Sequence, residues 1–374
     1  MNEKYASLFD SLTLNNGVVL KNRLAVAPLT EFGSNPDGTI SDEDRAYYRG
    51  RAEGYGLFIA PANCVAPAGK AFWGQPCSWG EEYLESLRET ASIIKAQGAV
   101  AVLQIHHGGD QAIKELIPNG DAVSASDEPE RGVRAMTGDE VEATVKAFAD
   151  AADLALRAGY DGVEIHGANQ YLLQQFYSAH TNKRTDRWGG AREKRMAFPL
   201  AVADAVLEVR EKHNRPDFVI GYRFSAEEPW DDGLTMEDTY ALVDELAKRP
   251  FQYLHMSQKN FWMHVRRGDS TEKSRLLEVR KRIAGRMALI GVGGLWTADD
   301  LVKARESGYA DLVAQGCAVL VNPGLPKLIE EGREGEIELA PDPARADRHG
   351  LPKRLWDMSV SGVLPWLPPV KKVE

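Results

Sequence analysis

Short apolar runs alternate with longer amphipathic segments along most of the chain. Eight runs are rich in β-branched and other apolar residues, at 23–29, 57–62, 100–107, 162–166, 218–225, 253–257, 288–293 and 311–316. Six segments with helical spacing of apolar residues lie between them, at 81–97, 138–157, 191–212, 236–247, 272–284 and 298–306. Short continuous apolar runs are typical of strands buried on both faces, and the longer periodic segments are typical of amphipathic helices. The pattern therefore predicts alternating strands and helices.

Three of these helices begin with a recognisable cap. A threonine is followed three residues later by an acid in the pairs Thr137 and Glu140, Thr235 and Asp238, and Thr297 and Asp300. The hydroxyl can accept from a free backbone N–H of the first turn, and the acid can bond back to the cap. Helices are therefore predicted to begin at residues 138, 236 and 298.

Near-continuous apolar strands separated by helices predict a parallel sheet that helices cover on both faces. An open doubly wound sheet usually has a glycine-rich dinucleotide turn after its first strand. Here the first run ends in VAPLTEFG, and no G-x-G-x-x-G follows a predicted strand. We therefore predict an α/β fold of the (β/α)8 TIM-barrel type. Asn16-Gly17, between two short apolar runs, predicts a β-hairpin, which we expect to plug the barrel floor.

No low-complexity linker divides the 374 residues, so a single domain is predicted over 1–374. Residues from about 340 to 374 end in the proline-rich LPWLPPVKKVE and are expected to form an extended tail. The hydrophobic share of 43% is enough for a sizeable core. The N-terminal MNEKYASLFD does not resemble a secretory signal, and no apolar run is long enough to span a membrane, which favours a cytoplasmic protein.

Charge and cysteine content argue against nucleic acid as a partner and against disulfide or metal sites. A net charge of −10 argues against broad contact with the phosphates of nucleic acid, which requires a basic face. Cys64, Cys77 and Cys317 are too scattered for a disulfide framework or a zinc site, so packing is their expected role. The adjacent His106 and His107 lack supporting carboxylates, and no metal is expected.

The stretch HGANQYLLQQFYSAHTNKRTDRWGG, residues 166–190, begins where the fourth run ends. In a TIM barrel the active site is built at the carboxyl ends of the strands and in the loops that follow them. Its polar residues, which include a histidine, an asparagine and two tyrosines, are therefore candidates for catalysis. The later RTDRWGG predicts an ion-paired turn that enters the next helix.

Six blocks resemble the signatures of the old yellow enzyme family of FMN-dependent ene-reductases. They are KNRLAVAPLTEFG, VLQIHHGG, the block from DGVEIHGANQY to RWGG, GYRFS, IGVGG and ADLVAQG, in the same order and at matching separations. The resemblance extends from about Leu8 to about Leu328 and looks most like the bacterial NADH-dependent flavin oxidoreductases without an iron–sulfur cluster. It implies FMN as cofactor, NADH or NADPH as co-substrate, and an α,β-unsaturated carbonyl compound or quinone as substrate.

The resemblance also implies roles for individual residues. Those implied to contact FMN are Pro28, Leu29, Thr30, Ala62, Gln104, Arg223, Gly294 and Gly316. Gln104 suits the pyrimidine edge of the flavin, Arg223 supplies positive charge there, and the two glycines suit the phosphate. For Gln104 and Arg223 the alternative is a hydrogen-bonded pair that stabilises the rim. His166 and Asn169 are implied to bind the substrate carbonyl oxygen, and Tyr171 is implied to protonate its α-carbon.

Three positions depart from the family pattern. Cys317 and Asp110 replace arginines, which removes positive charge near the expected cofactor, and Gln170 replaces a glycine. These changes keep open a second hypothesis, a catalytically impaired barrel that binds a flavin or another ligand. A metal-dependent hydrolase on the same fold is a third.

Other positions are expected around the site. His107 is expected at the rim, facing the flavin edge. The loops at 70–78 and 258–270 are expected to form pocket walls, with Trp73, Phe261 and Trp262 as candidates. Pairing of relatives through their C-terminal region makes a homodimer a hypothesis for the assembly.

Overall fold

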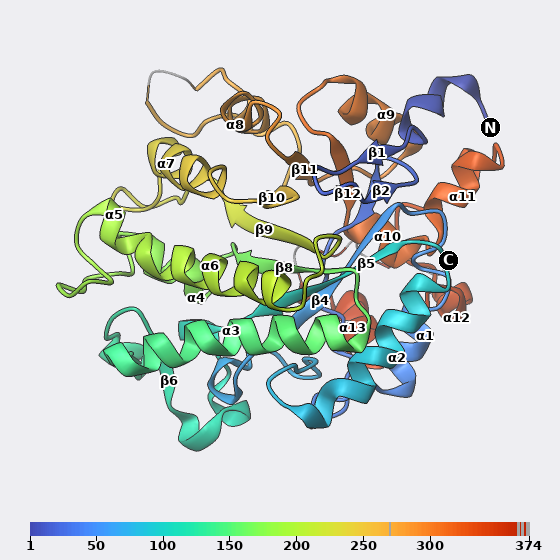
Figure 1. Ribbon diagram of the computed structural model, residues 1–374. Helices are drawn as coiled ribbons and strands as arrows, with labels where there is room; N and C mark the ends of the chain where they lie inside the picture. The colour runs from blue at the N-terminus through green and yellow to red at the C-terminus, as the bar shows by residue number, and fades with distance from the viewer. Residues whose placement is uncertain (269–270, 365–366, 368–369, 372–374) are drawn as a thin grey trace.

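The computed structural model describes residues 1–268, 271–364, 367 and 370–371. A closed barrel of eight strands forms its centre, in the order β10-β11-β12-β3-β4-β5-β8-β9. The strands are β3 (Leu24–Val26), β4 (Leu57–Cys64), β5 (Val100–His106), β8 (Gly162–Gly167), β9 (Val219–Ser225), β10 (Tyr253–Ser257), β11 (Ala288–Val292) and β12 (Leu312–Gln315). All neighbouring pairs are parallel, and helices lie around the outside (Figure 1). The predicted TIM barrel is confirmed.

The predicted helices occur with altered ends. They are α2 (Leu84–Lys95), α3 (Gly138–Ala158), α6 (Ala197–Lys212), α7 (Met236–Leu246), α8 (Arg275–Ile283) and α9 (Ala298–Glu306). The capping boxes at Thr137, Thr235 and Thr297 are all formed. Helix α8 begins three residues later than predicted, because Ser274 accepts from Leu277 N and caps it there. None of the helices in the described ranges has both the length and the apolar character needed to cross a bilayer.

Several short elements were not predicted. They are α1 (Asp42–Tyr48), α4 (Leu172–Tyr177), α5 (Arg192–Arg195), α10 (Cys317–Val321), α11 (Leu325–Glu330), and the paired strands β6 (Ala122–Ser124) and β7 (Val133–Ala135). Every residue of α4 is buried, including Gln174 and Gln175, so no exposed polar face marks the segment as an amphipathic helix. Segments of this length carry too little pattern to be distinguished from loops.

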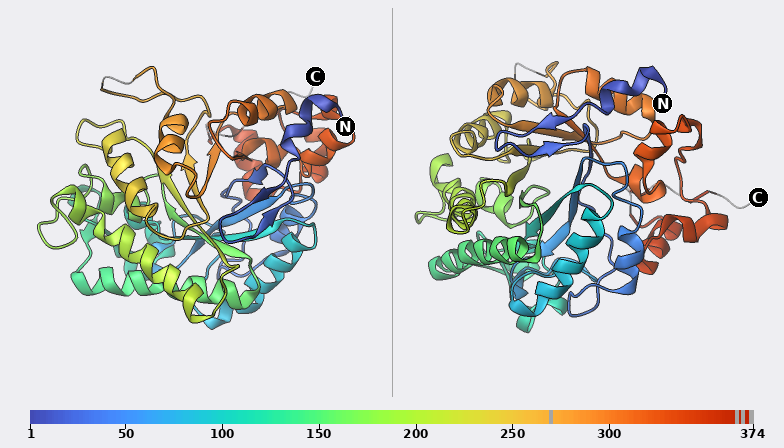
Figure 2. Two further views of the ribbon diagram at one scale, coloured as in Figure 1. Left: turned by 45° about the horizontal axis from the view of Figure 1, so that its top comes forward. Right: turned by 45° about the vertical axis from the view of Figure 1, so that its right-hand side comes forward.

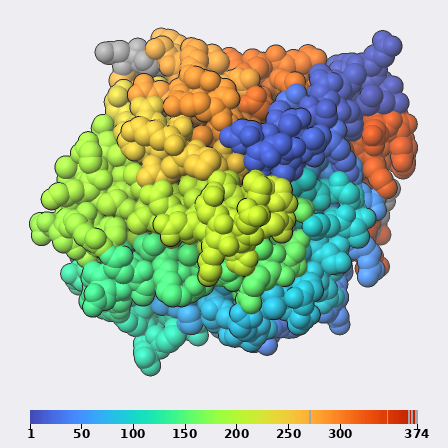
Figure 3. All heavy atoms as spheres, viewed as in Figure 1, coloured from blue at the N-terminus to red at the C-terminus, as the bar shows by residue number. Residues whose placement is uncertain are grey.

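The N-terminal hairpin closes the amino-terminal end of the barrel. Strands β1 (Leu12–Thr13) and β2 (Val19–Leu20) pair antiparallel around the Asn16-Gly17 turn. Leu14 and Leu20 are buried in the same apolar cluster as inward-facing residues of the barrel strands. The Asn15 amide donates to Phe251 O (2.7 Å) and Arg286 O (3.0 Å), just before β10 and β11. Figure 3 shows the blue N-terminal segment packed against yellow and orange segments, and the predicted plug is confirmed.

The C-terminal segment is not the extended tail that was predicted. It forms α12 (Ala346–His349) and α13 (Lys353–Ser361), and both pack on the barrel domain. Leu355 is fully buried, and the Arg51 guanidinium donates to His349 O (2.5 Å), which explains why the segment folds back. The red C-terminal helices lie beside the light-blue segment that contains α1 (Figure 2). Much of LPWLPPVKKVE, namely 365–366, 368–369 and 372–374, lies outside the described residues.

Candidate active site

Polar side chains line the inside of the barrel at its carboxyl-terminal end. Alternate residues of a strand point to the same face, so residues two apart share the barrel interior. Four neighbouring strands contribute such pairs: Gln104 and His106, Glu164 and His166, Arg223 and Ser225, and His255 and Ser257. All of these except the two serines are buried. The result is a polar ring above the apolar layer that contacts the hairpin.

Gln104 is held by Glu164, which was not among the predicted site residues. Its Nε2 donates to Glu164 Oε1 at 2.7 Å, and His255 Nδ1 lies 2.9 Å from the other carboxylate oxygen. Gln104 therefore pairs with Glu164, and the alternative of a Gln104–Arg223 pair is not formed. The signal for Glu164 was its position two residues before His166 on the same strand.

Arg223 is a buried cation whose Nε donates no hydrogen bond within the described residues. Its side chain is 7% exposed, and within the described residues Nε has no hydrogen-bond acceptor. Burial lowers the pKa of the guanidinium, and the nearby Glu164 carboxylate opposes that shift. A buried donor left unpaired costs about 1–3 kcal/mol. The arrangement fits a ligand that brings its own acceptor.

His166 is a neutral hydrogen-bond donor. Ala168 N donates to its Nδ1 at 3.4 Å, which leaves the ring proton on Nε2. Burial, reinforced by the nearby His106 and Arg223, holds the pKa of His166 well below its usual range. The Tyr171 ring lies 5.3 Å from the His166 ring, and burial raises the pKa of its phenol, which keeps the phenol protonated.

Asn169 lies on a strained turn between these two residues. It and Gln170 both have left-handed backbones, with φ of 58° and 62°. Asn169 Oδ1 accepts from Ser257 Oγ at 2.7 Å, so its amide nitrogen remains available as a donor. Gln111 Nε2 donates to the carbonyls of both turn residues, at 3.1 and 2.8 Å. The turn thus presents an amide beside His166 and Tyr171.

The other predicted FMN contacts also lie at the ends of barrel strands. Pro28, Leu29 and Thr30 follow β3, and Ala62 belongs to β4. Gly294 follows β11 with a φ of 65°, and Gly316 follows the neighbouring β12. A Cβ on Gly316 would lie 3.2 Å from Leu29 Cδ2, which places these two predicted contacts side by side.

Asp110 and Cys317, which replace arginines of the family pattern, have different surroundings. Asp110 pairs with Arg131 (3.1 Å) and accepts from Gln175 Nε2 (2.7 Å), and burial raises its pKa to about 6. It therefore holds the loop rather than standing as an unpaired negative charge. Cys317 begins α10, and burial raises the pKa of its thiol to about 11, which keeps it neutral. Cys64 and Cys77 are buried, in agreement with the expected packing role.

Of the four residues expected around the site, the structure corrects Phe261 and gives contacts for the other three. Phe261 is fully buried and packs against Gly291, so it is not a pocket wall. Trp262 lies under Lys303, and Trp73 is 43% exposed beside Arg354. His107 is buried and its ring packs against Gly69. Residues 269 and 270 of the expected wall lie outside the described residues.

The RTDRWGG segment forms the predicted turn. Arg184 pairs with Asp186, which also accepts from Trp188 N at 3.0 Å, and the Trp188 side chain is buried. Arg184 reaches the carbonyls of Ala125 and Met136, at 3.0 and 2.6 Å. The segment therefore braces the loop before α3 and does not belong to the polar ring.

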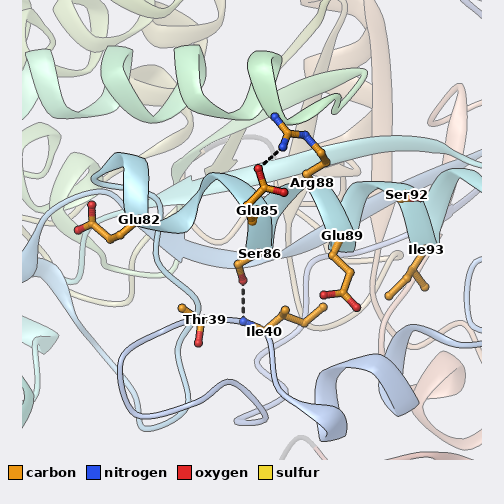
Figure 4. A pocket seen from close by; sticks show the side chains of 9 residues that line it. All are labelled: Thr39, Ile40, Glu82, Glu85, Ser86, Arg88, Glu89, Ser92 and Ile93. Carbon is orange, nitrogen blue, oxygen red and sulfur yellow. Dashed lines mark hydrogen bonds and ion pairs between the residues drawn. The ribbon is translucent and has the colours of Figure 1, made fainter.

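Outside the polar ring, two features of the described residues bear on other candidate sites. In the described part of the chain, no group of three or more His, Cys, Asp or Glu residues could hold a metal ion. A surface depression of about 580 Å³ lies between residues 39–40 and α2. Figure 4 shows its lining, where Ser86 accepts from Ile40 N (2.6 Å) and Glu85 pairs with Arg88. The depression is open and is lined by none of the residues of the polar ring. Its Glu89 carboxylate already pairs with Arg45 of α1 (2.6 Å).

Residues 7–336 match the NADH:flavin oxidoreductase / NADH oxidase family. The chain belongs to this family. It is 44% identical over 371 residues to the "Probable NADH-dependent flavin oxidoreductase YqiG" of Bacillus subtilis (strain 168), covering 98% of this chain and 99% of that protein. It is 33% identical to 12-oxophytodienoate reductase 1 of Oryza sativa subsp. japonica, covering 83% of each chain.

A solved structure of morphinone reductase with tetrahydroNAD superposes with a TM-score of 0.77 at 27% identity, covering 92% of this chain and 97% of that one. Together these similarities confirm the resemblance to the old yellow enzyme family. The chain is an NAD(P)H-dependent flavin oxidoreductase, with FMN as cofactor and NADH as co-substrate.

Proposed function

We propose that this enzyme reduces the C=C bond of α,β-unsaturated aldehydes, ketones and quinones, with NADH or NADPH as the electron source. The observation that carries the proposal is the set of three groups after β8: two neutral N–H donors, on His166 and Asn169, and the protonated phenol of Tyr171. Relatives named as reductases of 12-oxophytodienoate and morphinone support this class of substrate.

His166 and Asn169 are assigned to the substrate carbonyl oxygen. That oxygen gains negative charge as hydride reaches the β-carbon, and fixed donors stabilise it. One such donor is worth about 3–4 kcal/mol of barrier. Because burial keeps His166 neutral, it donates a hydrogen bond without bringing a full charge into the pocket. The Ser257 contact fixes which end of the Asn169 amide faces the substrate.

Tyr171 is assigned as the donor of a proton to the α-carbon. Its phenol is buried, and burial raises its pKa, so the proton stays on the hydroxyl until a stronger base is formed beside it. An enolate is such a base. The nearby Arg223 acts in the opposite direction on the phenol pKa and would stabilise the phenolate that remains.

The polar ring fits FMN. The chemistry that FMN supplies when bound is hydride transfer from the nicotinamide to the substrate. Arg223, whose Nε lacks an acceptor, and Gln104, whose amide is oriented by Glu164, are assigned to the polar edge of the flavin. Pro28, Leu29, Thr30 and Ala62 are assigned to its ring system.

Gly294 and Gly316 are assigned to the phosphate. Asn260 belongs to the same region, because its Nδ2 lies 3.6 Å from the position of a Cβ on Gly294. Its Oδ1 accepts from Trp262 N at 2.9 Å, so Nδ2 is the end that faces the glycine. This amide is a candidate replacement for the arginine that the family has at position 317.

The test is an absorbance spectrum of the purified protein, followed by anaerobic addition of NADH and then of 2-cyclohexenone. Flavin bands that bleach with NADH and return with the enone are expected. A flavoprotein that bleaches with NADH but is not reoxidised by enones, enals or quinones would contradict the proposed substrate class. A protein that holds flavin but is not bleached by NADH or NADPH would favour the impaired barrel.

The domain organisation and the assembly are part of the same proposal. One domain predicts a single unfolding transition that is the same by fluorescence and by circular dichroism. A homodimer predicts a mass of twice 41.3 kDa in light scattering.

A further inference from the structure

His106 occupies a central place among the candidate catalytic side chains. It is fully buried on β5, and its ring centroid lies 4.3 Å from that of Tyr171 and 5.4 Å from that of His166. On its other side it contacts Gln75, which belongs to the loop after β4 (Nε2 to Nδ1, 3.0 Å). His106 therefore connects this loop to the proposed proton donor.

Gln75 fixes the proton on His106. The orientation of the Gln75 amide is set by two backbone groups, because Oε1 accepts from Ala71 N (2.7 Å) and Nε2 donates to Ala62 O (3.1 Å). Nε2 is therefore also the donor to His106 Nδ1. An imidazole that accepts at Nδ1 and is neutral carries its proton on Nε2.

That Nε2–H group has no hydrogen-bond acceptor within the described residues, although it is buried. A buried unpaired donor costs about 1–3 kcal/mol. The His106 and Tyr171 rings meet edge to face, at an interplanar angle of 84°. In such a pair the positive edge of one ring lies against the negative face of the other, and N–H groups can be stabilised by aromatic faces.

Few other contacts hold the Tyr171 side chain. Its hydroxyl makes no hydrogen bond with the described residues. Burial raises the pKa of the phenol, and the charge of Arg223 acts in the opposite direction. Its backbone follows the strained Asn169–Gln170 turn and begins α4 without a side-chain cap. The rings of His106 and His166 are thus the aromatic contacts that orient the phenol.

We propose that His106 is a positioning residue, held by Gln75, that orients the ring of Tyr171 over the reacting carbon. The role of Tyr171 itself rests on the proposed function. Proton transfer is sensitive to geometry, and a misplacement of about 1 Å can cost roughly 100-fold in rate. Loss of His106 should therefore slow the enone half-reaction much more than it slows reduction by NADH.

The first measurement reports the position of the ring without using catalysis. A 3-fluorotyrosine is placed at position 171, and its ¹⁹F spectrum is recorded in the FMN-loaded protein, in His106→Ala and in the control His107→Ala. His107 is also buried, but its ring packs against Gly69. We expect a shifted or broadened line in His106→Ala only. The same line in all three proteins would overturn the proposal.

The second measurement is a double-mutant cycle on single-turnover reoxidation by 2-cyclohexenone. His106→Ala is expected to slow this step roughly 10- to 100-fold in the native background and less than about 2-fold in Tyr171→Phe, because interacting residues are not additive. Equal slowing in both backgrounds would contradict action through Tyr171. If Tyr171→Phe alone is as fast as the native enzyme, the proton-donor assignment fails, and the ¹⁹F spectrum still decides whether His106 orients the ring.

Should His106→Ala fail to fold, Gln75→Leu serves in its place. This variant keeps the imidazole but removes the donor that fixes its proton. The proposal predicts a broadened ¹⁹F line, since the His106 ring becomes free to change tautomer and orientation. An unchanged line would contradict it.

Discussion

The two ends of the barrel differ in how far their buried polar groups are hydrogen-bonded. At the floor, Asn15 and Gln252 are fully bonded: Asn15 donates to Phe251 O and Arg286 O and accepts from Gln252, and Gln252 accepts from Ile220 N. At the mouth, buried donor or acceptor atoms on His106, Arg223 and His255 have no partner within the described residues. The hydrogen bonds at the floor stabilise the fold, whereas the unpaired polar atoms at the mouth are available to bind ligands.

This difference has an energetic consequence. Each unpaired buried group costs about 1–3 kcal/mol, so the mouth lowers the stability of the ligand-free protein. The apolar cluster around Leu14 and Leu20 at the floor contributes in the opposite direction. Variants at the mouth should therefore change catalysis and ligand binding, and variants at the floor should change stability alone.

Tyr171→Phe tests the catalytic side of this comparison. Removal of a general acid should slow reoxidation by 2-cyclohexenone by about 10²- to 10⁴-fold. Reduction of the flavin by NADH should remain within a factor of about 2, because the phenol takes no part in it. Stopped-flow absorbance measures both steps. Equal loss in both half-reactions would contradict the assignment.

Leu20→Ala tests the stability side. Leu20 is fully buried in the floor cluster, and truncation of such a side chain should lower the free energy of unfolding by about 2–5 kcal/mol. Urea denaturation measures the loss. Both half-reactions should keep their native rates below the unfolding transition, and a change in either would show that the two ends are coupled.

Arg223→Met and Arg210→Met form a matched pair of buried arginines. Arg210 Nη1 near the floor donates to Pro250 O (3.1 Å) and Gln252 Oε1 (3.2 Å), whereas Arg223 Nε has no acceptor. Arg223→Met should weaken FMN binding roughly 10- to 100-fold, since it removes a charged donor, and should leave apoprotein stability unchanged or raised. Arg210→Met should destabilise the protein and leave FMN affinity unchanged. Fluorescence titration and thermal unfolding would reveal the opposite pattern if Arg223 were structural.

The sequence predicted the barrel because each strand and its helix carry a local, periodic signal. It also predicted the hairpin, since Asn16-Gly17 favours a tight turn and the flanking leucines must be buried. It did not predict α13, because the contacts that hold this segment, from Arg51 to His349 O and from Lys353 N to Glu43 of α1, join residues that are remote in sequence.

The part of the candidate site that was predicted also carries a local signal in the sequence. His166, Asn169 and Tyr171 lie close together in sequence, after one strand. The Gln104–Glu164 and Gln75–His106 contacts join different strands and loops, so only the closed barrel brings them together. The sequence indicates that these polar residues share the inward face, because they lie two residues apart along a strand. It does not indicate which polar groups pair, because pairing depends on strand register.

Stability should fall in acid because of the buried histidines at the mouth. Burial lowers the pKa of His106 to about 3 and of His107 to about 4, below the value of about 6.5 expected when unfolded. Between those values the unfolded state binds more protons, so stability is present above pH about 6.5 and is lost as the pH falls. Each histidine contributes a slope of up to about 1.4 kcal/mol per pH unit.

His106→Asn isolates one of these contributions. Asp44 and Asp110, whose pKa values burial raises to about 6, act in the opposite sense, so the difference between the native protein and the variant is the relevant quantity. The slope of unfolding free energy against pH from 6 to 4 should be smaller in the variant by about one histidine's share. Identical slopes would show that His106 is protonated in the folded protein.

Gln170→Gly should produce the smallest effect, and it bears on the strain at the mouth. A left-handed backbone costs a residue with a Cβ about 1–2 kcal/mol, and glycine avoids that cost but loses about 0.5–1 kcal/mol through its freer unfolded chain. With a φ of 62° at Gln170, the net gain in stability should be about 0.5 kcal/mol. Gln170→Ala keeps the backbone strain and should leave the melting temperature unchanged. A fall in the melting temperature of Gln170→Gly would mean that Gln111 and Gln175, which bond the turn carbonyl, hold it without strain.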